Sequence, residues 1–354
     1  MKIDVWKIPQ NAPDDLTALK QLIQAQQIEP RSIIAVMGKT EGNGCVNDFT
    51  RGFAVQSLQF YLRSYLTPEA IEQIIFVMSG GTEGILSPHL TVFTRQQVSA
   101  DTPPNWGLVL GTSQTRNFLP AEIGTITMVE VVAEGVRQAI ADAGLTIPEV
   151  HFVQIKCPLL NSSRTQGEQV QTQDSYKSMA YSRAASALGV ALALGEITPA
   201  QLQPSDICHN YHLYSAVAST SAGVELQNCE ILVFGNSPHS HSDLLINHSV
   251  MDHALDGAAV REAIEGLKKI AGIDGSIEIV NVFAKAEADP TGQILGQRHT
   301  MLDDSDISHT RMARAVVGAV IASIVQDPMI YVSGGSEHQG PAGGGPIAVL
   351  GRVR

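Results

Sequence analysis

The chain has 354 residues, of which 44% are hydrophobic and 16% are charged, and this balance excludes an intrinsically disordered protein. Asp and Glu outnumber Lys and Arg by 35 to 23, so the net charge of −12 argues against a nucleic-acid partner. The N-terminal segment lacks the apolar stretch of a signal peptide, and no run of about 20 apolar residues predicts a membrane span. We therefore expect a cytoplasmic protein with no membrane partner and reduced cysteines.

In chain order, the first recurring element is an apolar segment rich in Val, Ile and Phe that predicts a strand and ends in a lysine. The three copies end at Lys39, Lys156 and Lys285. A helical pattern follows each strand, and it opens with a hydroxyl residue and an arginine. These arginines are Arg51, Arg183 and Arg311. Asp306 is a candidate cap for the third helix, and Gly195 is a plausible end for the second.

The third recurring element is an apolar strand that runs into the motif Ser-small-Gly-x-Glu, and a further strand follows it. The motif serines are Ser79, Ser221 and Ser333. One unit thus reads strand-Lys, Arg-helix, strand-Ser, strand, and three copies fill the chain. We predict an α/β fold of three similar units around a pseudo-threefold axis, with strands meeting at a central site. The predicted units are 1–103, 107–247 and 253–354, with a linker at 98–106 and a surface loop at 161–175.

Packing around such an axis brings three lysines, three arginines and three serines to one cavity. That cavity would be strongly positive and would favour an anionic or carbonyl-rich ligand, because hydroxyl and backbone N–H groups also donate to carbonyl oxygens. A small planar ring with three carbonyls at 120° would match this symmetry. Serine becomes a nucleophile only when a base takes its proton, and a lysine whose pKa is lowered by burial and by neighbouring cations is such a base.

The three lysine–serine pairs need not be equivalent. Lys39 and Lys285 each have an acid two residues further on, Glu41 and Glu287, on the same face of a strand. Such an acid would keep its lysine charged, whereas Lys156 lacks one. This pattern predicts Lys156 as the base. Ser221 of the same unit would be the nucleophile, and Ser79 and Ser333 would hold the other carbonyls.

These motifs resemble the cyanuric acid hydrolase/barbiturase family of cyclic amidases along essentially the whole chain. The segments that carry the resemblance are 36–51, 77–84, 155–160, 181–189, 219–226, 281–288, 298–311 and 331–346. The resemblance implies three α/β units around a pseudo-threefold axis and a homotetramer. It implies hydrolytic opening of cyanuric acid to carboxybiuret, which loses CO₂ to give biuret in s-triazine degradation.

The resemblance also implies roles for individual residues. Its catalytic serine and lysine map onto Ser221 and Lys156. Its substrate contacts map onto Arg51, Ser79, Gly80, Arg183, Ser221, Ala222, Arg311, Ser333 and Gly334, beside Lys39 and Lys285. Ala222 stands where the other copies have Gly, which changes little if the backbone N–H is the contact.

No organic cofactor is expected, but the resemblance implies a structural Mg²⁺, with Ca²⁺ as the alternative. Its ligands map onto Glu287 with oxygens of Ser336, Gln339, Gly340, Pro341 and Gly344. A carboxylate with backbone carbonyls suits such hard cations. A metal ligand at Glu287 would weaken its predicted pairing with Lys285.

Three alternatives stay open at this point. A barbiturase, which opens barbituric acid to ureidomalonate, would share all these motifs. A zinc-dependent amidase would use His239 and His241 with His248 and His253, although the polar segment around the first two favours a solvated loop. A non-catalytic binder of a small anionic ring would need the arginines and serines but no lysine of lowered pKa.

Overall fold

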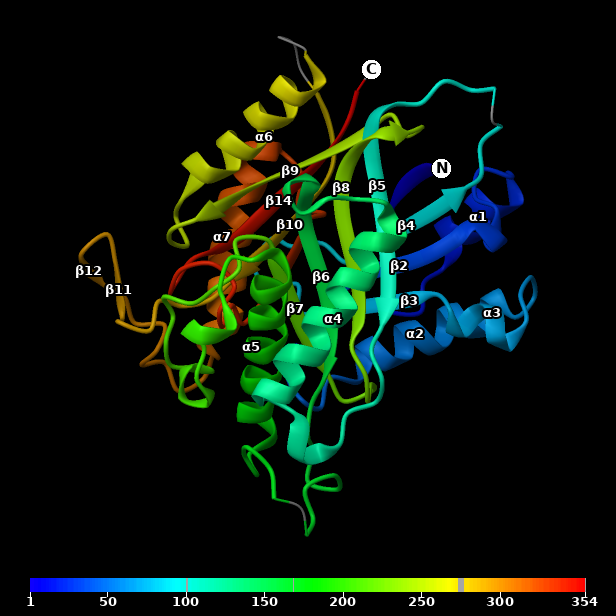
Figure 1. Ribbon diagram of the computed structural model, residues 1–354. Helices are drawn as coiled ribbons and strands as arrows, with labels where there is room; N and C mark the ends of the chain where they lie inside the picture. The colour runs from blue at the N-terminus through cyan, green and yellow to red at the C-terminus, as the bar shows by residue number, and fades with distance from the viewer. Residues whose placement is uncertain (100, 168, 273–276, 354) are drawn as a thin grey trace.

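The computed structural model describes residues 1–99, 101–167, 169–272 and 277–353, and it shows a mixed α/β fold built on three four-stranded sheets (Figure 1). The predicted linker at 98–106 and the predicted loop at 161–175 each contain one residue outside these ranges. Within the described part of the chain, no helix is both long and apolar enough to cross a membrane.

The first sheet has the strand order β1-β4-β2-β3. Its strands are β1 (Lys2–Pro9), β2 (Ile33–Thr40), β3 (Ile75–Gly80) and β4 (His89–Gln96). The accompanying helices are α1 (Thr17–Gln24), α2 (Phe49–Leu62) and α3 (Pro68–Glu72).

The second and third sheets repeat this order as β5-β8-β6-β7 and β9-β14-β10-β13. The second unit contains β5 (Asn105–Gln114), α4 (Ile126–Ala143), β6 (Val150–Pro158), α5 (Ser175–Leu194), β7 (Ala218–Gly223) and β8 (Glu230–Ser240). The third contains β9 (Leu244–Met251), α6 (Gly257–Ala271), β10 (Glu278–Ala286), α7 (His309–Val325), β13 (Tyr331–Gly334) and β14 (Gly345–Arg352), with a small hairpin of β11 (Gln293–Ile294) and β12 (Gln297–Arg298). The predicted threefold internal repeat of α/β units is therefore confirmed.

The third unit begins earlier in the chain than the position predicted from the sequence. Strand β9 starts at Leu244 and pairs antiparallel with β14, so these residues belong to the third sheet. The predicted units end at 247 and resume at 253, which cuts through this strand. Half of β9 is only partly buried and carries polar residues such as His248 and Ser249, which gave the segment the composition of a linker.

Two helix starts also differ from the sequence pattern. Helix α5 begins at Ser175, where the Asp174 carboxylate accepts hydrogen bonds from two backbone N–H groups, so Arg183 lies two turns inside the helix. Helix α7 follows Ser308, and Asp306 does not cap it. The predicted end of α5 at Gly195 is confirmed, since this glycine has the left-handed backbone conformation that ends many helices.

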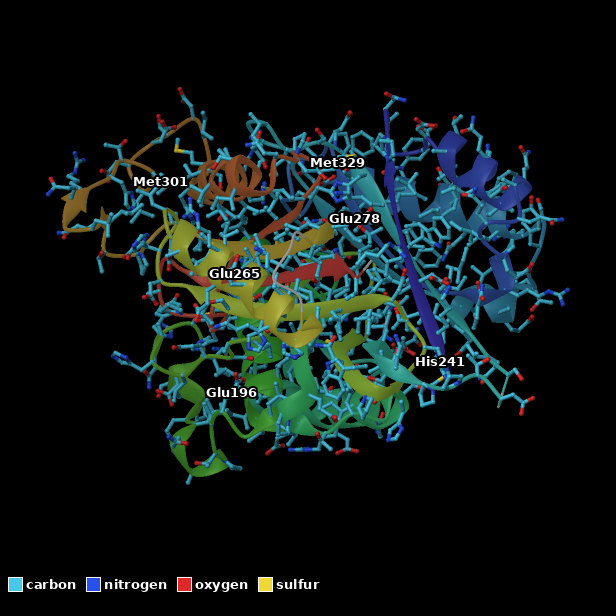
Figure 2. All side chains as sticks on the ribbon, turned by 90° about the horizontal axis from the view of Figure 1, so that it is seen from above. Glu196, His241, Glu265, Glu278, Met301 and Met329 are labelled. Carbon is cyan, nitrogen blue, oxygen red and sulfur yellow. The ribbon has the colours of Figure 1, made fainter. Side chains whose placement is uncertain are left out.

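The hydrophobic core has a central part shared by all three units. The inner faces of the sheets meet there, and Phe93, Phe234 and Phe283, one from each unit, have ring centroids 5.3–6.4 Å apart. Three further clusters lie between the outer faces of the sheets and their helices. Seen from above, the three units surround a common centre (Figure 2). The inner faces therefore direct their side chains towards one axis.

Candidate active site

The predicted lysines and serines lie opposite each other on neighbouring strands. In each unit the Lys strand and the Ser strand run parallel. Their register pairs Lys39 with Ser79, Lys156 with Ser221 and Lys285 with Ser333. Along these strands the side chains of the inner face alternate with those of the outer face. The central aromatic core thus ends in a layer of three lysines and three serines, all at most 7% exposed.

One pocket joins residues of all three units above this layer. Its lining includes the serine loops Ser79-Gly80, Ser221-Ala222 and Ser333-Gly334, with Lys156 and the arginines Arg51, Arg183 and Arg314. The structure therefore brings together most of the residues predicted for substrate binding. Lys39 and Lys285 are buried beside the pocket and donate hydrogen bonds to Ser79 Oγ and Ser333 Oγ, at 3.3 and 3.2 Å.

The third arginine of the pocket is Arg314, whereas the sequence pattern pointed to Arg311. The Arg311 side chain is 41% exposed, whereas that of Arg314 is 4% exposed and lines the pocket. The two residues are three positions apart on α7 and lie on neighbouring parts of its surface. Matching the hydroxyl-Arg pair to the other copies pointed to Arg311, whereas the arginine that lines the pocket lies one turn further along α7.

The three buried lysines differ in their contacts. Lys156 Nζ donates to the carbonyl of Met78 at 2.8 Å and lies 3.2 Å from Glu225 Oε1. Lys285 Nζ donates to the carbonyl of Thr220 at 2.8 Å. Burial, with nearby Arg314, holds the pKa of Lys39 well below its usual value, and burial, with nearby Arg183, does the same for Lys285. Burial also lowers the pKa of Lys156, but the Glu225 carboxylate opposes that shift.

The predicted pairing of lysines with acids is wrong. Glu41 is exposed, while Lys39 is buried against Ser79 and Gly80. Glu287 contacts His309 and Thr310 instead of forming an ion pair with Lys285. Lys156, expected to lack an acid, is the lysine that has one. The prediction considered only acids on the same strand as each lysine. The acid next to Lys156 is Glu225, which lies on the loop after β7.

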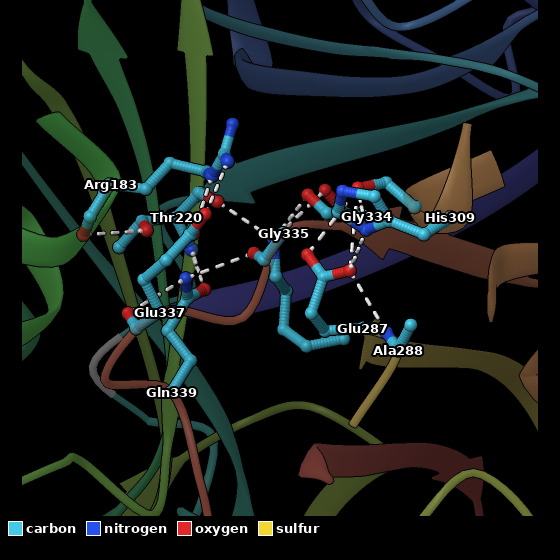
Figure 3. A network of polar contacts seen from close by, with 12 residues as sticks. Arg183, Thr220, Glu287, Ala288, His309, Gly334, Gly335, Glu337 and Gln339 are labelled. Atoms are coloured by element: carbon cyan, nitrogen blue, oxygen red, sulfur yellow. Dashed lines mark hydrogen bonds and ion pairs between the residues drawn. The ribbon is translucent and has the colours of Figure 1, made fainter. Parts of the chain in front are cut away.

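Three glutamates that the sequence analysis left without a role lie around the pocket. They are Glu83, Glu225 and Glu337, each four residues after its serine. Glu83 accepts from Arg314 at 2.6 and 2.8 Å, and Glu337 accepts from Arg183 at the same two distances (Figure 3). Glu225 lies 4.0 Å from Arg51 Nε. Every pair joins two different units, and the glutamates offset much of the positive charge predicted for the pocket. The repeated Ser-to-Glu spacing was the signal that could have identified them.

Five of the six residues predicted to hold a cation lie on the loop between β13 and β14, and the sixth, Glu287, directly follows β10. Glu287 and Ser336 line one cavity, and Ser336 Oγ donates to the carbonyl of Gly344 at 3.1 Å. The side-chain amide of Gln339 is already engaged, because it accepts from Thr220 N and donates to the carbonyl of Gly335 (Figure 3). Gly344 N donates to the carbonyl of Pro341, and Gly340 N donates to Ser215. The Glu287 carboxylate and the backbone carbonyls of the loop are hard oxygen donors, and the carbonyls of Pro341 and Gly344 accept hydrogen bonds within the loop.

The histidines considered for zinc lie elsewhere. His239 belongs to the end of β8 and is exposed, and His248 Nδ1 lies 3.0 Å from His151 Nδ1. Across the residues that the structure describes, no group of three or more His, Cys, Asp or Glu side chains is arranged to hold a metal ion. The four cysteines are free.

Comparison with known proteins agrees with this geometry. The family model described as "Amidohydrolase ring-opening protein" matches residues 4–352. A cyanuric acid amidohydrolase of Enterobacter cloacae is 51% identical, with 100% of both chains covered. A solved cyanuric acid hydrolase is 49% identical with a TM-score of 0.92 over 99% of both chains, and that of A. caulinodans is 46% identical with a TM-score of 0.93 over 100% of this chain and 99% of the other. The full-length match shows that this chain is a member of the ring-opening amidohydrolase family, to which its repeated motifs had pointed.

Proposed function

We propose that this enzyme opens the ring of cyanuric acid by hydrolysis of a ring C–N bond, giving carboxybiuret, which then loses CO₂ to form biuret. The observation that carries the proposal is the threefold arrangement of serine loops and arginines around one pocket. Cyanuric acid has three carbonyls at 120°, so each carbonyl can face one serine loop. The named relatives act on the same compound.

Ser221 is the proposed nucleophile and Lys156 its base. As Ser221 Oγ forms a bond to a ring carbonyl carbon, its proton passes to the neutral Lys156 amine. The ammonium then protonates the ring nitrogen as the C–N bond breaks, which leaves an acyl group on Ser221. Water attacks this ester with Lys156 again as base, and the serine is released. Ser221 Oγ lies 2.9 Å from Ser333 Oγ, and a bound carbonyl would replace that contact.

The remaining groups would bind and polarise the ring. Ser79 and Ser333 each receive a hydrogen bond from a lysine of their own unit, which leaves their hydroxyl protons available for carbonyl oxygens. The backbone N–H groups of the serine loops, including that of Ala222, can stabilise the developing oxyanion. The arginines add positive charge next to the carbonyls.

Barbiturase activity is the alternative within the same family, because barbituric acid is a similar six-membered ring. The deciding experiment incubates the purified protein with cyanuric acid and, separately, with barbituric acid, and follows loss of each ring by ultraviolet absorbance. We expect kcat/KM to be higher for cyanuric acid. Faster loss of barbituric acid would contradict the proposal, and binding of both compounds without turnover would support a non-catalytic binder.

The two arginines of α7 give a direct test of the pocket. We expect Arg314→Ala to raise the KM for cyanuric acid roughly 10–100-fold, because it removes a buried charged donor of the pocket and leaves Glu83 with the partly exposed Arg311 as its ion-pair partner. Arg311→Ala should change KM by less than about threefold, since its exposed ion pair contributes little. Steady-state kinetics of both variants check this. A larger effect at Arg311 would support the residue that the sequence pattern selected.

We also propose that Glu287 and carbonyl oxygens of the loop at 336–344 hold a structural Mg²⁺ or Ca²⁺. The donor set supports a hard cation, and Glu287 with Ser336 lines a shared cavity. When bound, the cation would crosslink β10 to the loop after β13 and so stabilise the third unit. It takes no part in the proposed chemistry of Ser221 and Lys156.

Removal of this cation should lower the thermal stability. We expect extensive chelation to reduce the Tm by about 5 °C, because a ligand that binds only the folded state adds free energy of unfolding. Added Mg²⁺ or Ca²⁺ should restore it. In Glu287→Gln the Tm should not respond to chelation, and this variant is the control. A Tm of the wild type that is unchanged by chelation, together with no metal by elemental analysis, would contradict the site.

A homotetramer is proposed as well. Large apolar side chains are exposed on α2, where Phe49 and Phe60 are 77% and 74% exposed. Exposed aromatic residues of this size are enriched at interfaces between subunits. Sedimentation or light scattering measures the mass, and a monomer at micromolar concentration would contradict this proposal.

A further inference from the structure

Glu225 differs from its two counterparts in the partner that it selects. Glu83 and Glu337 each accept two hydrogen bonds from an arginine of another unit. Glu225 lies 4.0 Å from Arg51, the arginine in the equivalent place, but 3.2 Å from Lys156 Nζ. The pseudo-threefold pattern of Glu–Arg pairs is therefore broken at one position, and that position contains the proposed base.

Because of this break, Lys156 and Arg51 have contacts that differ from those of their counterparts in the other units. Among the three buried lysines, Lys156 alone has its Nζ within ion-pair distance of a carboxylate in the described residues. Arg51 donates to the carbonyl of Cys45 at 2.9 Å, but its Nε is buried and has no hydrogen-bond partner in the described part of the chain. An unpaired buried donor costs free energy, so Arg51 Nε is available to a ligand oxygen. Its two counterparts, Arg183 and Arg314, use Nε to bind a glutamate.

We infer that Glu225 is a positioning residue that makes the middle lysine–serine pair the reactive one, by orienting Lys156 and stabilising the ammonium that forms on it. This inference rests on the proposed function. Lys156 Nζ contacts both the Glu225 carboxylate, at 3.2 Å, and the Met78 carbonyl, at 2.8 Å. Ser221, Lys156 and Glu225 then form a nucleophile, a base and an acid that orients the base, the arrangement found in serine hydrolases that use a triad.

The proton balance of the step explains the need for a carboxylate. When Ser221 Oγ bonds to the carbonyl carbon, its proton moves to Lys156 Nζ and creates a buried positive charge. Glu225 lies within ion-pair distance of that charge and stays ionised throughout, so no further proton moves. The proton then leaves Lys156 for the ring nitrogen. Lys39 and Lys285 donate to serines and backbone carbonyls, and neither has a carboxylate within ion-pair distance in the described residues.

The direction of the pH effect follows from the groups that face Lys156. These are Glu225 from the loop after β7, Arg51 from α2, Cys157 from its own strand and Glu230 from β8. Burial and Arg51 lower the lysine pKa, whereas Glu225 raises it. Activity that needs the neutral amine rises with pH through the lysine pKa. Removal of the Glu225 charge lowers that pKa further, so the acidic limb of the kcat profile should move to lower pH.

The test compares Glu225→Gln with Glu83→Gln, its matched counterpart in the first unit. We expect Glu225→Gln to lower kcat about 10–100-fold, with a smaller change in KM and an acidic limb displaced to lower pH. Glu83→Gln should act mainly on KM through Arg314 and leave the limb in place. Glu225→Asp keeps the negative charge, so the acidic limb of its kcat profile should lie close to that of the wild type. Glu230→Gln removes the neighbouring acid and should leave the limb in place.

Equal effects of Glu225→Gln and Glu83→Gln on kcat and KM, with no displacement of the limb, would overturn the inference. Thermal melting of each variant identifies a loss of folding. If Glu225→Gln does not fold, Glu225→Asp is compared with the wild type instead. Failure of the proposed function is distinguished because it appears in the wild type, as absence of cyanuric acid hydrolysis, before any variant is assayed.

Discussion

Replacement of Ser221 by alanine is expected to lower the turnover of cyanuric acid by about 10⁴-fold or more, because no other residue can then form the acyl intermediate. Ser221 lies opposite Lys156 in the strand register and is 7% exposed at the pocket. Binding should survive, since the arginines and the other two serines remain. Steady-state kinetics measure the loss, and calorimetric titration measures binding.

The other two serines are the controls for this prediction. Ser79→Ala and Ser333→Ala each remove one proposed donor to a carbonyl, a loss that costs about 10²–10³-fold in comparable sites. In a rapidly quenched reaction of the wild type, peptide mass analysis should find the acyl group on Ser221. A Ser221→Ala enzyme that keeps normal turnover while Ser79→Ala loses it would show that the first unit supplies the nucleophile.

Replacement of Lys156 by methionine should lower kcat by about 10³-fold, with little change in the affinity for cyanuric acid. Methionine is close in volume to lysine and suits an apolar setting, so the buried site keeps its packing. Glu225 would lose its lysine partner but retain Arg51 nearby at 4.0 Å. Kinetics and calorimetric titration on the same preparation separate turnover from binding.

Lys39→Met and Lys285→Met are the matched controls. Each lysine donates to a serine rather than to a glutamate, so we expect weaker binding of the ring and a smaller loss of kcat than in Lys156→Met. Small primary amines added to Lys156→Met should restore part of the activity if the side chain acts as a base. A Lys285→Met enzyme with the largest loss of kcat would move the base to the third unit.

The fold and most residues of the pocket were predictable because the motifs that form them are short stretches of sequence that occur three times in the chain. A lysine and a serine at the ends of inward-facing strands recur in each unit, and strand alternation alone places them on one face. Ser79, Ser221 and Ser333 therefore meet in the pocket, as predicted. Strand β9 escaped prediction because half of it is only partly buried and its composition resembles a linker.

The charge pairing could not be predicted because it joins segments that are remote in sequence. Arg314 binds Glu83, 231 residues away, across two units. The periodicity of a strand or helix does not predict a contact between segments so far apart. The choice between Arg311 and Arg314 depends on which turn of α7 faces the axis. Lys156 acquires Glu225 from a loop of its own unit, which reversed the expectation that it has no acid.

The break in the threefold pattern of Glu–Arg pairs has a consequence for the statistics of binding. Only Ser221 is the proposed nucleophile, so a ligand must present a scissile carbonyl to one of three loops. Cyanuric acid offers the same face after each turn of 120°, and all three orientations are productive. Barbituric acid has lower symmetry. If only one of its three orientations in the pocket is productive, two thirds of its binding events do not lead to hydrolysis. Orientational degeneracy alone thus favours the symmetric ring by about threefold, or about 0.65 kcal/mol, before any contact differs.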